Sequence, residues 1–131
     1  MFLIDSDVLI SFCKGRTSLQ ERLVQAGLPQ CVISEVSLAE LLVGAYKSGR
    51  KTEFQEIRKL RELFSPIPLS YDILDRYAKL RVLLEVQGNR LEDMDLFIAA
   101  TALANDYTLV THNTRHFSRI PGLKLEDWIE E

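Results

Sequence analysis

The first ten residues, MFLIDSDVLI, place two carboxylates one residue apart directly behind a short apolar run. The run Phe2–Ile4 predicts a buried strand of a parallel sheet, because such strands are a few large apolar residues that stop abruptly at polar groups. Asp5 and Asp7 follow at the carboxyl end of this strand, where burial and mutual repulsion both cost free energy. Two explanations are open: the carboxylates cap the helix expected next, or they hold a divalent cation such as Mg2+.

Further oxygen-bearing side chains lie at points that a parallel sheet would bring to the same edge. Glu40 falls in the first turns of the helix expected after the second strand, and Asp95 falls in the first turn of a later helix. Thr111 and Asn113 end the clearest expected strand. In open parallel sheets, the carboxyl ends of the strands and the amino ends of the following helices share the ligand-binding edge. Clustered buried carboxylates repel one another unless a cation neutralises them, so this convergence favours a metal site.

Each of these positions also has a purely structural interpretation. Ser37 and Glu40 have the spacing of a capping box, in which Glu40 serves only the start of the helix. Asp93 or Asp95 could cap a helix or interact with its dipole, and Asn113 suits any turn. Taken singly, the residues leave both interpretations open. Their expected meeting at one edge is what favours the metal.

The histidines and cysteines do not add a zinc site or a disulfide framework. His112 and His116 are four residues apart, but they follow a strand and no helix is predicted there, so a zinc pair is not expected. We interpret both as polar loop residues. Cys13 and Cys31 form no CxxC pair and are interpreted as buried free thiols of a reducing compartment.

Length and composition are those of one globular domain. The 131 residues, of which 47% are hydrophobic and 27% charged, fit a single domain over residues 1–131. The net charge of −3 supplies no global basic field for nucleic acid, although a nuclease can take local positive charge from metal ions. No basic leader precedes the apolar start and no run of about 18 apolar residues occurs, so we expect a cytoplasmic protein without membrane insertion.

The acidic residues are positioned by strands that alternate with helices. This alternation predicts an α/β fold, with a parallel sheet covered by helices on both faces. The prolines of Pro66–Leu69 allow only a short or edge strand there. Thr17 or Ser18 is expected to cap the second helix, Ser70 is expected to cap a later one, and Trp128 is expected to dock the tail. Strands are expected over residues 2–4, 31–33, 66–69, 107–111 and 123–125.

Four segments resemble the successive motifs of a known family. They are FLIDSDVLI, the Glu40 segment SLAELLVG, DLFIAATAL from Asp95, and LVTHNTRHF from Leu109. In this order and spacing they resemble the PIN-domain family, and within it the VapC-type toxin ribonucleases of toxin–antitoxin pairs. The resemblance spans the chain, including the tail GLKLEDW. It implies a PIN-like three-layer α/β/α sandwich with a short, mainly parallel central sheet and many helices.

The resemblance implies an endoribonuclease that depends on Mg2+ or Mn2+. Residue by residue, the family's acidic quartet falls on Asp5, Glu40, Asp95 and Asn113. The three carboxylates are the expected metal ligands, and such a metal activates water for attack on a phosphodiester. Relatives often carry Asp at the fourth position, so Asn113 departs from the pattern. Asn113 therefore weakens the expectation that a second metal is held firmly.

Four further residues are assigned supporting roles by the resemblance or by their position. Asp7 stands where relatives carry Asn or Asp, and it partly compensates for Asn113. Thr111 matches the family's hydroxyl residue beside the site. Lys14 and Arg16 could contact RNA phosphates, although a solvated loop is the simpler interpretation of both.

The resemblance also implies three partners: an RNA substrate, a cognate VapB-type antitoxin and a second copy of the chain in a homodimer. The helical region around Leu41, Leu42, Phe54 and Ile57 is expected to offer the antitoxin a groove. An antitoxin segment in that groove could insert a basic side chain among the carboxylates and block metal binding.

Three alternative functions fit parts of the sequence. A haloacid-dehalogenase-type phosphatase has a similar first motif, but it needs a lysine and an acidic motif after the hydroxyl-bearing strand, where only Lys124 remains. A phosphoacceptor receiver domain needs an acceptor Asp at the end of a central strand, where this chain has Ser34. A catalytically inactive PIN-like scaffold that binds RNA or protein stays open because of Asn113, although the three retained carboxylates argue against it.

Overall fold

The computed structural model describes residues 1–129 and contains a five-stranded sheet in which every neighbouring pair of strands is parallel. The strands lie in the order β3-β2-β1-β4-β5, so β1 is central. They are β1 (Phe2–Ile4), β2 (Cys31–Ser34), β3 (Ser65–Ile67), β4 (Thr108–Val110) and β5 (Leu125–Glu126). The predicted parallel sheet is confirmed, and each of its five strands overlaps one of the five predicted regions.

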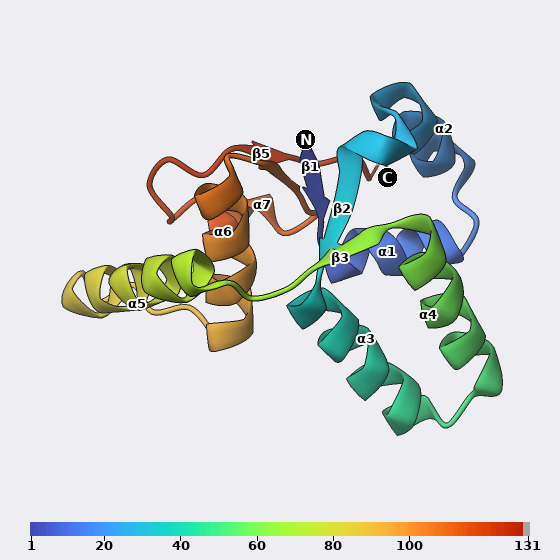
Figure 1. Ribbon diagram of the computed structural model, residues 1–131, viewed down its shortest axis with the longest axis horizontal. Coiled ribbons are helices and arrows are strands. Elements are labelled where there is room, and N and C mark those ends of the chain that lie inside the picture. The colour runs from blue at the N-terminus through green and yellow to red at the C-terminus, as the bar shows by residue number, and fades with distance from the viewer. Residues whose placement is uncertain (130–131) are drawn as a thin grey trace.

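Helices cover both faces of this sheet, as Figure 1 shows. They are α1 (Ser6–Cys13), α2 (Thr17–Ala26), the short 3-10 helix η1 (Leu28–Gln30), α3 (Glu35–Ser48), α4 (Lys51–Leu63), α5 (Tyr71–Val86), α6 (Asp93–Asn105) and α7 (Thr114–Phe117). Beyond β2, α3 and α4 form an adjacent pair that extends away from the sheet (Figure 1). No helix within residues 1–129 is long and apolar enough to cross a bilayer.

Alternate residues of the central strands enter two separate hydrophobic cores. Leu3 and Leu109 pack in the core that α5, α6 and α7 cover. Ile4, Ile33 and Val110 pack in the core that α1, α2 and α4 cover. This division follows from the period of two along a strand, which turns successive side chains to opposite faces. The predicted three-layer α/β/α sandwich is confirmed.

One predicted helix cap is wrong, and the capping-box interpretation of Glu40 is excluded. Ser34, the last residue of β2, caps α3 by accepting a backbone N–H two residues ahead at 3.1 Å. Ser37 therefore lies inside α3, and the capping box with Glu40 does not form, because the strand passes into the helix without a connecting loop. Arg16 stands at the N-cap of α2, so Thr17 and Ser18 are already helical.

Three other local predictions are confirmed. Pro66 lies in β3, an edge strand of the sheet, where a missing N–H is tolerated. Ser70 caps α5 by accepting the N–H of Ile73 at 3.3 Å. Trp128 is 4% exposed, and its ring meets Phe2 edge-on at a centroid distance of 5.0 Å. The docked tail thus covers β1 and holds β5 against β4.

Candidate active site

Asp5 lies at the centre of the carboxyl edge of the sheet, between β1 and α1. Its Oδ1 accepts the N–H of Ser6 at 2.8 Å, which caps α1, and its Oδ2 accepts the hydroxyl of Thr111 at 2.9 Å. The residue is 6% exposed. Burial raises the pKa of Asp5 to about 6, and the nearby Asp7 and Asp95 carboxylates add to the increase. Capping and clustering therefore coexist in one residue, which the sequence interpretation treated as alternatives.

Asp7 joins the start of α1 to the segment that follows β4. Its Oδ1 accepts the N–H of Val8 at 2.7 Å, and its Oδ2 accepts the backbone N–H of His112 at 3.0 Å. The hydroxyl of Thr111 lies 3.4 Å from the same Oδ2. Burial raises the pKa of Asp7, while these hydrogen bonds oppose the increase. Both oxygens are thus used within the protein, which suits a supporting role.

Glu40 brings a third carboxylate to this edge from α3. The hydroxyl of Ser6 donates to its Oε1 at 3.5 Å, so α1 and α3 meet at this contact. Burial raises the pKa of Glu40 to about 7, and the charges of Asp5, Asp95 and Asp7 add to the increase. Four carboxylates, from α1, α3 and α6 and from the end of β1, therefore gather at this edge, and their charges act on Asp5 and Glu40.

Asp95, in the first turn of α6, has a partner that the sequence interpretation missed. Its Oδ2 lies 2.9 Å from Nε2 of His116 on α7. The prediction that no helix covers His116 was wrong, because Thr114–Phe117 forms a short helix that begins after Asn113. A helix of four residues is too short to show a hydrophobic period, and only the N-cap propensity of Asn113 could have indicated it.

Asp93 serves a different purpose from Asp95. It accepts the hydroxyl of Tyr77 at 2.8 Å and lies 3.4 Å from the guanidinium of Arg81, both on α5. Glu92 stands at the N-cap of α6, and its side chain makes no capping hydrogen bond. Asp93 therefore joins α6 to α5, and these contacts stabilise the end of α6 that carries Asp95.

The remaining predicted residues lie at the margin of the cluster or beyond it. Asn113 is exposed and donates its backbone N–H to the hydroxyl of Thr111 at 3.1 Å, while no hydrogen bond within residues 1–129 engages its side chain. Lys14 is exposed beside the groove that Glu40 borders. For Arg16, no contact in the described part of the chain brings the side chain to the acidic edge.

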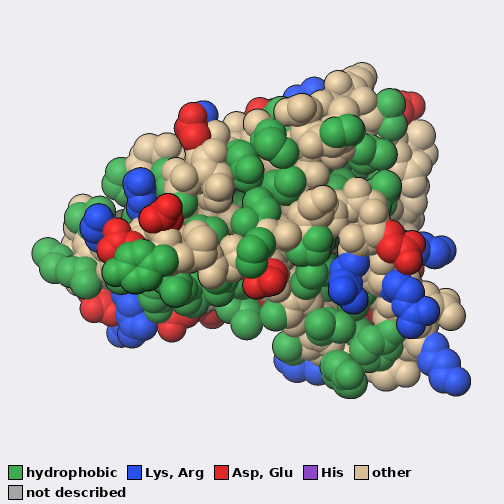
Figure 2. All heavy atoms as spheres, viewed as in Figure 1, with side chains coloured by type: hydrophobic (Ala, Val, Ile, Leu, Met, Phe, Trp, Pro, Cys, Tyr) green, Lys and Arg blue, Asp and Glu red, His purple; other side chains and the backbone are tan. Residues whose placement is uncertain are grey.

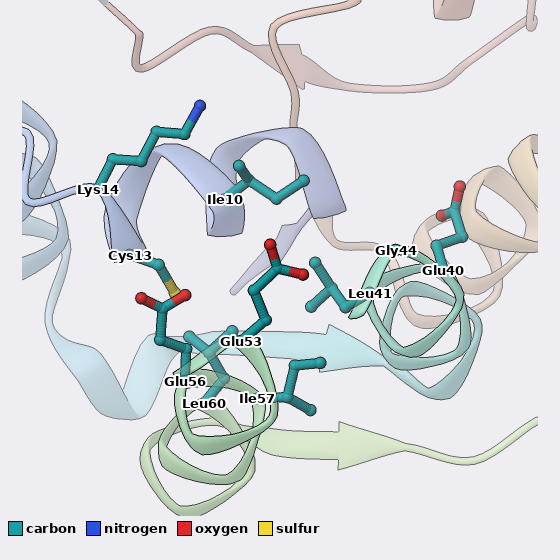
Figure 3. A pocket seen from close by; sticks show the side chains of 10 residues that line it. All are labelled: Ile10, Cys13, Lys14, Glu40, Leu41, Gly44, Glu53, Glu56, Ile57 and Leu60. Carbon is teal, nitrogen blue, oxygen red and sulfur yellow. The ribbon is translucent and has the colours of Figure 1, made fainter. Parts of the chain in front are cut away.

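A groove of about 270 Å3 opens between α1, α3 and α4, with Glu40 at its border (Figure 3). Leu41 and Ile57, two of the four residues predicted around an antitoxin groove, line it; Leu42 does not, and Phe54 packs against Tyr46. The lining combines apolar side chains with three acidic ones and one basic one: Ile10, Leu41, Ile57 and Leu60 with Glu40, Glu53, Glu56 and Lys14. Its chemistry suits an apolar segment that carries basic residues.

The donor set of the acidic edge fits a hard divalent cation. Carboxylate oxygens are the ligands that Mg2+ and Mn2+ prefer, and within residues 1–129 no Lys or Arg forms an ion pair with Asp5, Asp7 or Glu40. Across the same residues, no three His, Cys, Asp or Glu side chains are already closed around one point. Asp5, Asp7 and Glu40 thus gather at this edge without a Lys or Arg partner among the described residues, and a metal site here would need side-chain adjustment.

Comparison with known proteins relates this arrangement to a family. Residues 2–123 match the family described as PIN domain. Ribonuclease VapC1 of Haemophilus influenzae (strain R2866) is 32% identical over 133 residues, which cover 98% of each protein. The tRNA(fMet)-specific endonuclease VapC of Shigella flexneri is 33% identical over 131 residues, which cover 97% of each.

A solved structure extends the likeness to three dimensions. The crystal structure of VapBC2 from Rickettsia felis, bound to a DNA fragment from their promoter, contains a chain that is 30% identical and superposes with a TM-score of 0.91. The superposition covers 98% of both chains, so the likeness includes the whole arrangement of sheet and helices.

Proposed function

The chain belongs to the PIN-domain family, among its VapC-type toxin ribonucleases, and from this premise we propose that Asp5, Glu40 and Asp95 hold a divalent cation for RNA cleavage. It is a toxin ribonuclease that a VapB antitoxin neutralises. The observation that carries the metal proposal is the meeting of Asp5 and Glu40 at one edge, where no Lys or Arg of residues 1–129 forms an ion pair with either carboxylate. Burial and the neighbouring carboxylates accordingly raise the pKa of both residues. The inactive scaffold is not favoured, since a scaffold gains nothing from this repulsion.

In this proposal some residues of the acidic edge bind the cation, and others orient the carboxylates that bind it. Thr111 donates to Asp5 and Ser6 donates to Glu40, so two hydroxyls fix the carboxylates that face the cation. Asp7 ties the two loops of the edge together. When bound, Mg2+ or Mn2+ supplies Lewis-acid activation of water and neutralises phosphate charge. Glu40 would act either as a ligand of the cation or as the base that positions the attacking water.

Cleavage of total cellular RNA tests this function. The purified chain, free of antitoxin, is incubated with the RNA in the presence of Mg2+, Mn2+ or EDTA, and the new ends are mapped. Discrete cuts that EDTA abolishes are expected, with 5′-phosphate and 3′-hydroxyl ends. Because the pool contains transfer, ribosomal and messenger RNA, the mapped ends also identify the substrate. Cuts that persist in EDTA would reject the metal-dependent mechanism.

We propose that the groove beside Glu40 receives the antitoxin. Gly44 on α3 lines this groove, and a Cβ added there meets no atom within 4 Å, so a larger side chain can enter the space without disturbing the helix. Gly44→Phe is expected to weaken binding of the co-expressed VapB-type antitoxin at least about tenfold, because the ring occupies the groove, which corresponds to about 1.4 kcal/mol. Calorimetric titration of the purified chain with the antitoxin measures the change.

Gly44→Ala is the matched control for the groove. It removes the same glycine and stabilises the helix by about 1 kcal/mol, but it leaves most of the groove open. If Gly44→Phe and Gly44→Ala bind the antitoxin equally well, the groove is not the docking site.

We propose that an apolar stripe on α5 pairs with the same stripe of a second copy. Figure 2 shows hydrophobic side chains gathered over α5, and Tyr71, Val82 and Val86 are 81%, 61% and 81% exposed. Tyr71 lies at the start of α5, and Val82 and Val86 lie in its last turns. An antiparallel copy related by a two-fold axis therefore brings the apolar start of each helix against the apolar end of the other. Val82→Glu is expected to convert a dimer into a monomer in sedimentation velocity. Val24→Glu, at an exposed position on α2, should leave the dimer intact, and a dimer that survives Val82→Glu would contradict the surface.

A further inference from the structure

His116 and Asp95 form a direct contact between α7 and α6 at the acidic edge. Nε2 of His116 lies 2.9 Å from Oδ2 of Asp95, and the two side chains are 25% and 23% exposed. A carboxylate oxygen only accepts hydrogen bonds, so Nε2 must carry the hydrogen and donate it. Oδ2 of Asp95 is thereby engaged, whereas no hydrogen bond within residues 1–129 reaches Oδ1.

The imidazole ring of His116 is held in place by its own surroundings. The ring of Phe117 meets it at a centroid distance of 5.5 Å and an interplanar angle of 83°. Phe117 is itself 1% exposed in the core beneath α7. The backbone N–H of His116 donates to the carbonyl of Asn113 at 3.2 Å. A donor that is anchored in this way can fix the orientation of the carboxylate it contacts.

We propose that His116 is a positioning residue that leaves Asp95 a single oxygen for the cation and thereby favours Mg2+ or Mn2+ over Ca2+. The inference rests on the proposed metal site. Mg2+ demands a small, nearly octahedral set of ligands, whereas Ca2+ takes about six to eight oxygens and readily accepts both oxygens of one carboxylate. Oδ2 of Asp95 already accepts the hydrogen bond from His116. A cation that bound both oxygens of Asp95 would therefore have to break this hydrogen bond.

Cation binding to His116→Ala and His116→Gln, without RNA, tests the proposal. Calorimetric titrations of the metal-stripped chain with Mn2+ and with Ca2+ give the two dissociation constants. His116→Ala is expected to weaken Mn2+ binding about tenfold and to shift the preference towards Ca2+, because both oxygens of Asp95 become free. His116→Gln keeps an N–H donor near the position of Nε2, so its Mn2+ affinity should stay within about threefold of the wild-type value.

Two outcomes would overturn the proposal. Tighter Mn2+ binding by His116→Ala would mean that His116 competes with the cation for Asp95. Unchanged Mn2+ and Ca2+ affinities would mean that the contact only joins α6 to α7. Asp5→Asn distinguishes these failures from failure of the metal site itself: if Asp5→Asn also binds Mn2+ like the wild type, the cation binds elsewhere. Thermal melts of each variant establish that it is folded, and 15N NMR of the imidazole establishes whether Nε2 carries the hydrogen.

Discussion

Asp5→Asn is expected to reduce RNA cleavage by more than about a hundredfold while leaving the protein at least as stable as the wild type. Replacing outer partners of a metal typically costs about 10–100-fold in affinity or activity, and loss of a ligand costs more. The amide still accepts the N–H of Ser6, which keeps the cap of α1. The substitution also removes a buried negative charge, which the carboxylates of Asp7 and Asp95 repel. Opposite changes in activity and stability are the signature of a residue retained for function.

Initial rates of RNA cleavage and urea unfolding curves, both with Mg2+ and with EDTA, measure the two effects of Asp5→Asn. Asp72→Asn is the matched control, because Asp72 is exposed in the first turn of α5, outside the acidic cluster. Its cleavage rate should equal that of the wild type. Cleavage by Asp5→Asn within tenfold of the wild-type rate would contradict the assignment of Asp5 as a ligand.

The metal-free protein is expected to lose stability as the pH rises from about 4 to about 8. The folded-state pKa of Asp5 is about 6 against 3.8 in the unfolded chain, and that of Glu40 is about 7 against 4.5. A raised carboxyl pKa means that the folded state binds the proton more tightly. The resulting stabilisation is complete below the unfolded value and disappears as the pH passes the folded value. For Asp5 the difference corresponds to about 3 kcal/mol of unfolding free energy.

Saturating Mg2+ should reverse this loss at the upper end of the pH range, because a ligand that binds only the folded state stabilises it by about 2.7 kcal/mol at a hundredfold excess over its dissociation constant. Urea unfolding at several pH values, with EDTA or with Mg2+, measures both the loss of stability with rising pH and the stabilisation by Mg2+. Asp5→Asn is the internal control, since it lacks the Asp5 titration and should show a shallower pH dependence than the wild type. An identical pH dependence in the two proteins would contradict the raised pKa of Asp5.

Local sequence patterns were sufficient where the cause of a structure is itself local. The run Phe2–Ile4 ends at a carboxylate because a parallel strand is buried up to its end, and the prolines after Ser65 restrict that segment to an edge. Ser70 caps α5 because its hydroxyl needs only the backbone of the next turn. The same reasoning allowed a capping box of Ser37 with Glu40, whereas Ser34 caps α3, because both serines carry the right hydroxyl and only the length of β2 decides between them.

The sequence by itself determined the α/β class, the parallel sheet and the candidate carboxylates, because hydrophobic period, strand ends and motif order are properties of neighbouring residues. Only the tertiary structure decided how these carboxylates are used. Asp93 lies two residues before Asp95 and accepts a hydrogen bond from Tyr77 on α5. Asp95 instead contacts His116, which is 21 residues further along the chain. Thr111 reaches Asp5 across a sequence separation of 106 residues. Such contacts depend on which strands are neighbours and how the helices pack, and no local pattern encodes the direction in which a side chain then points.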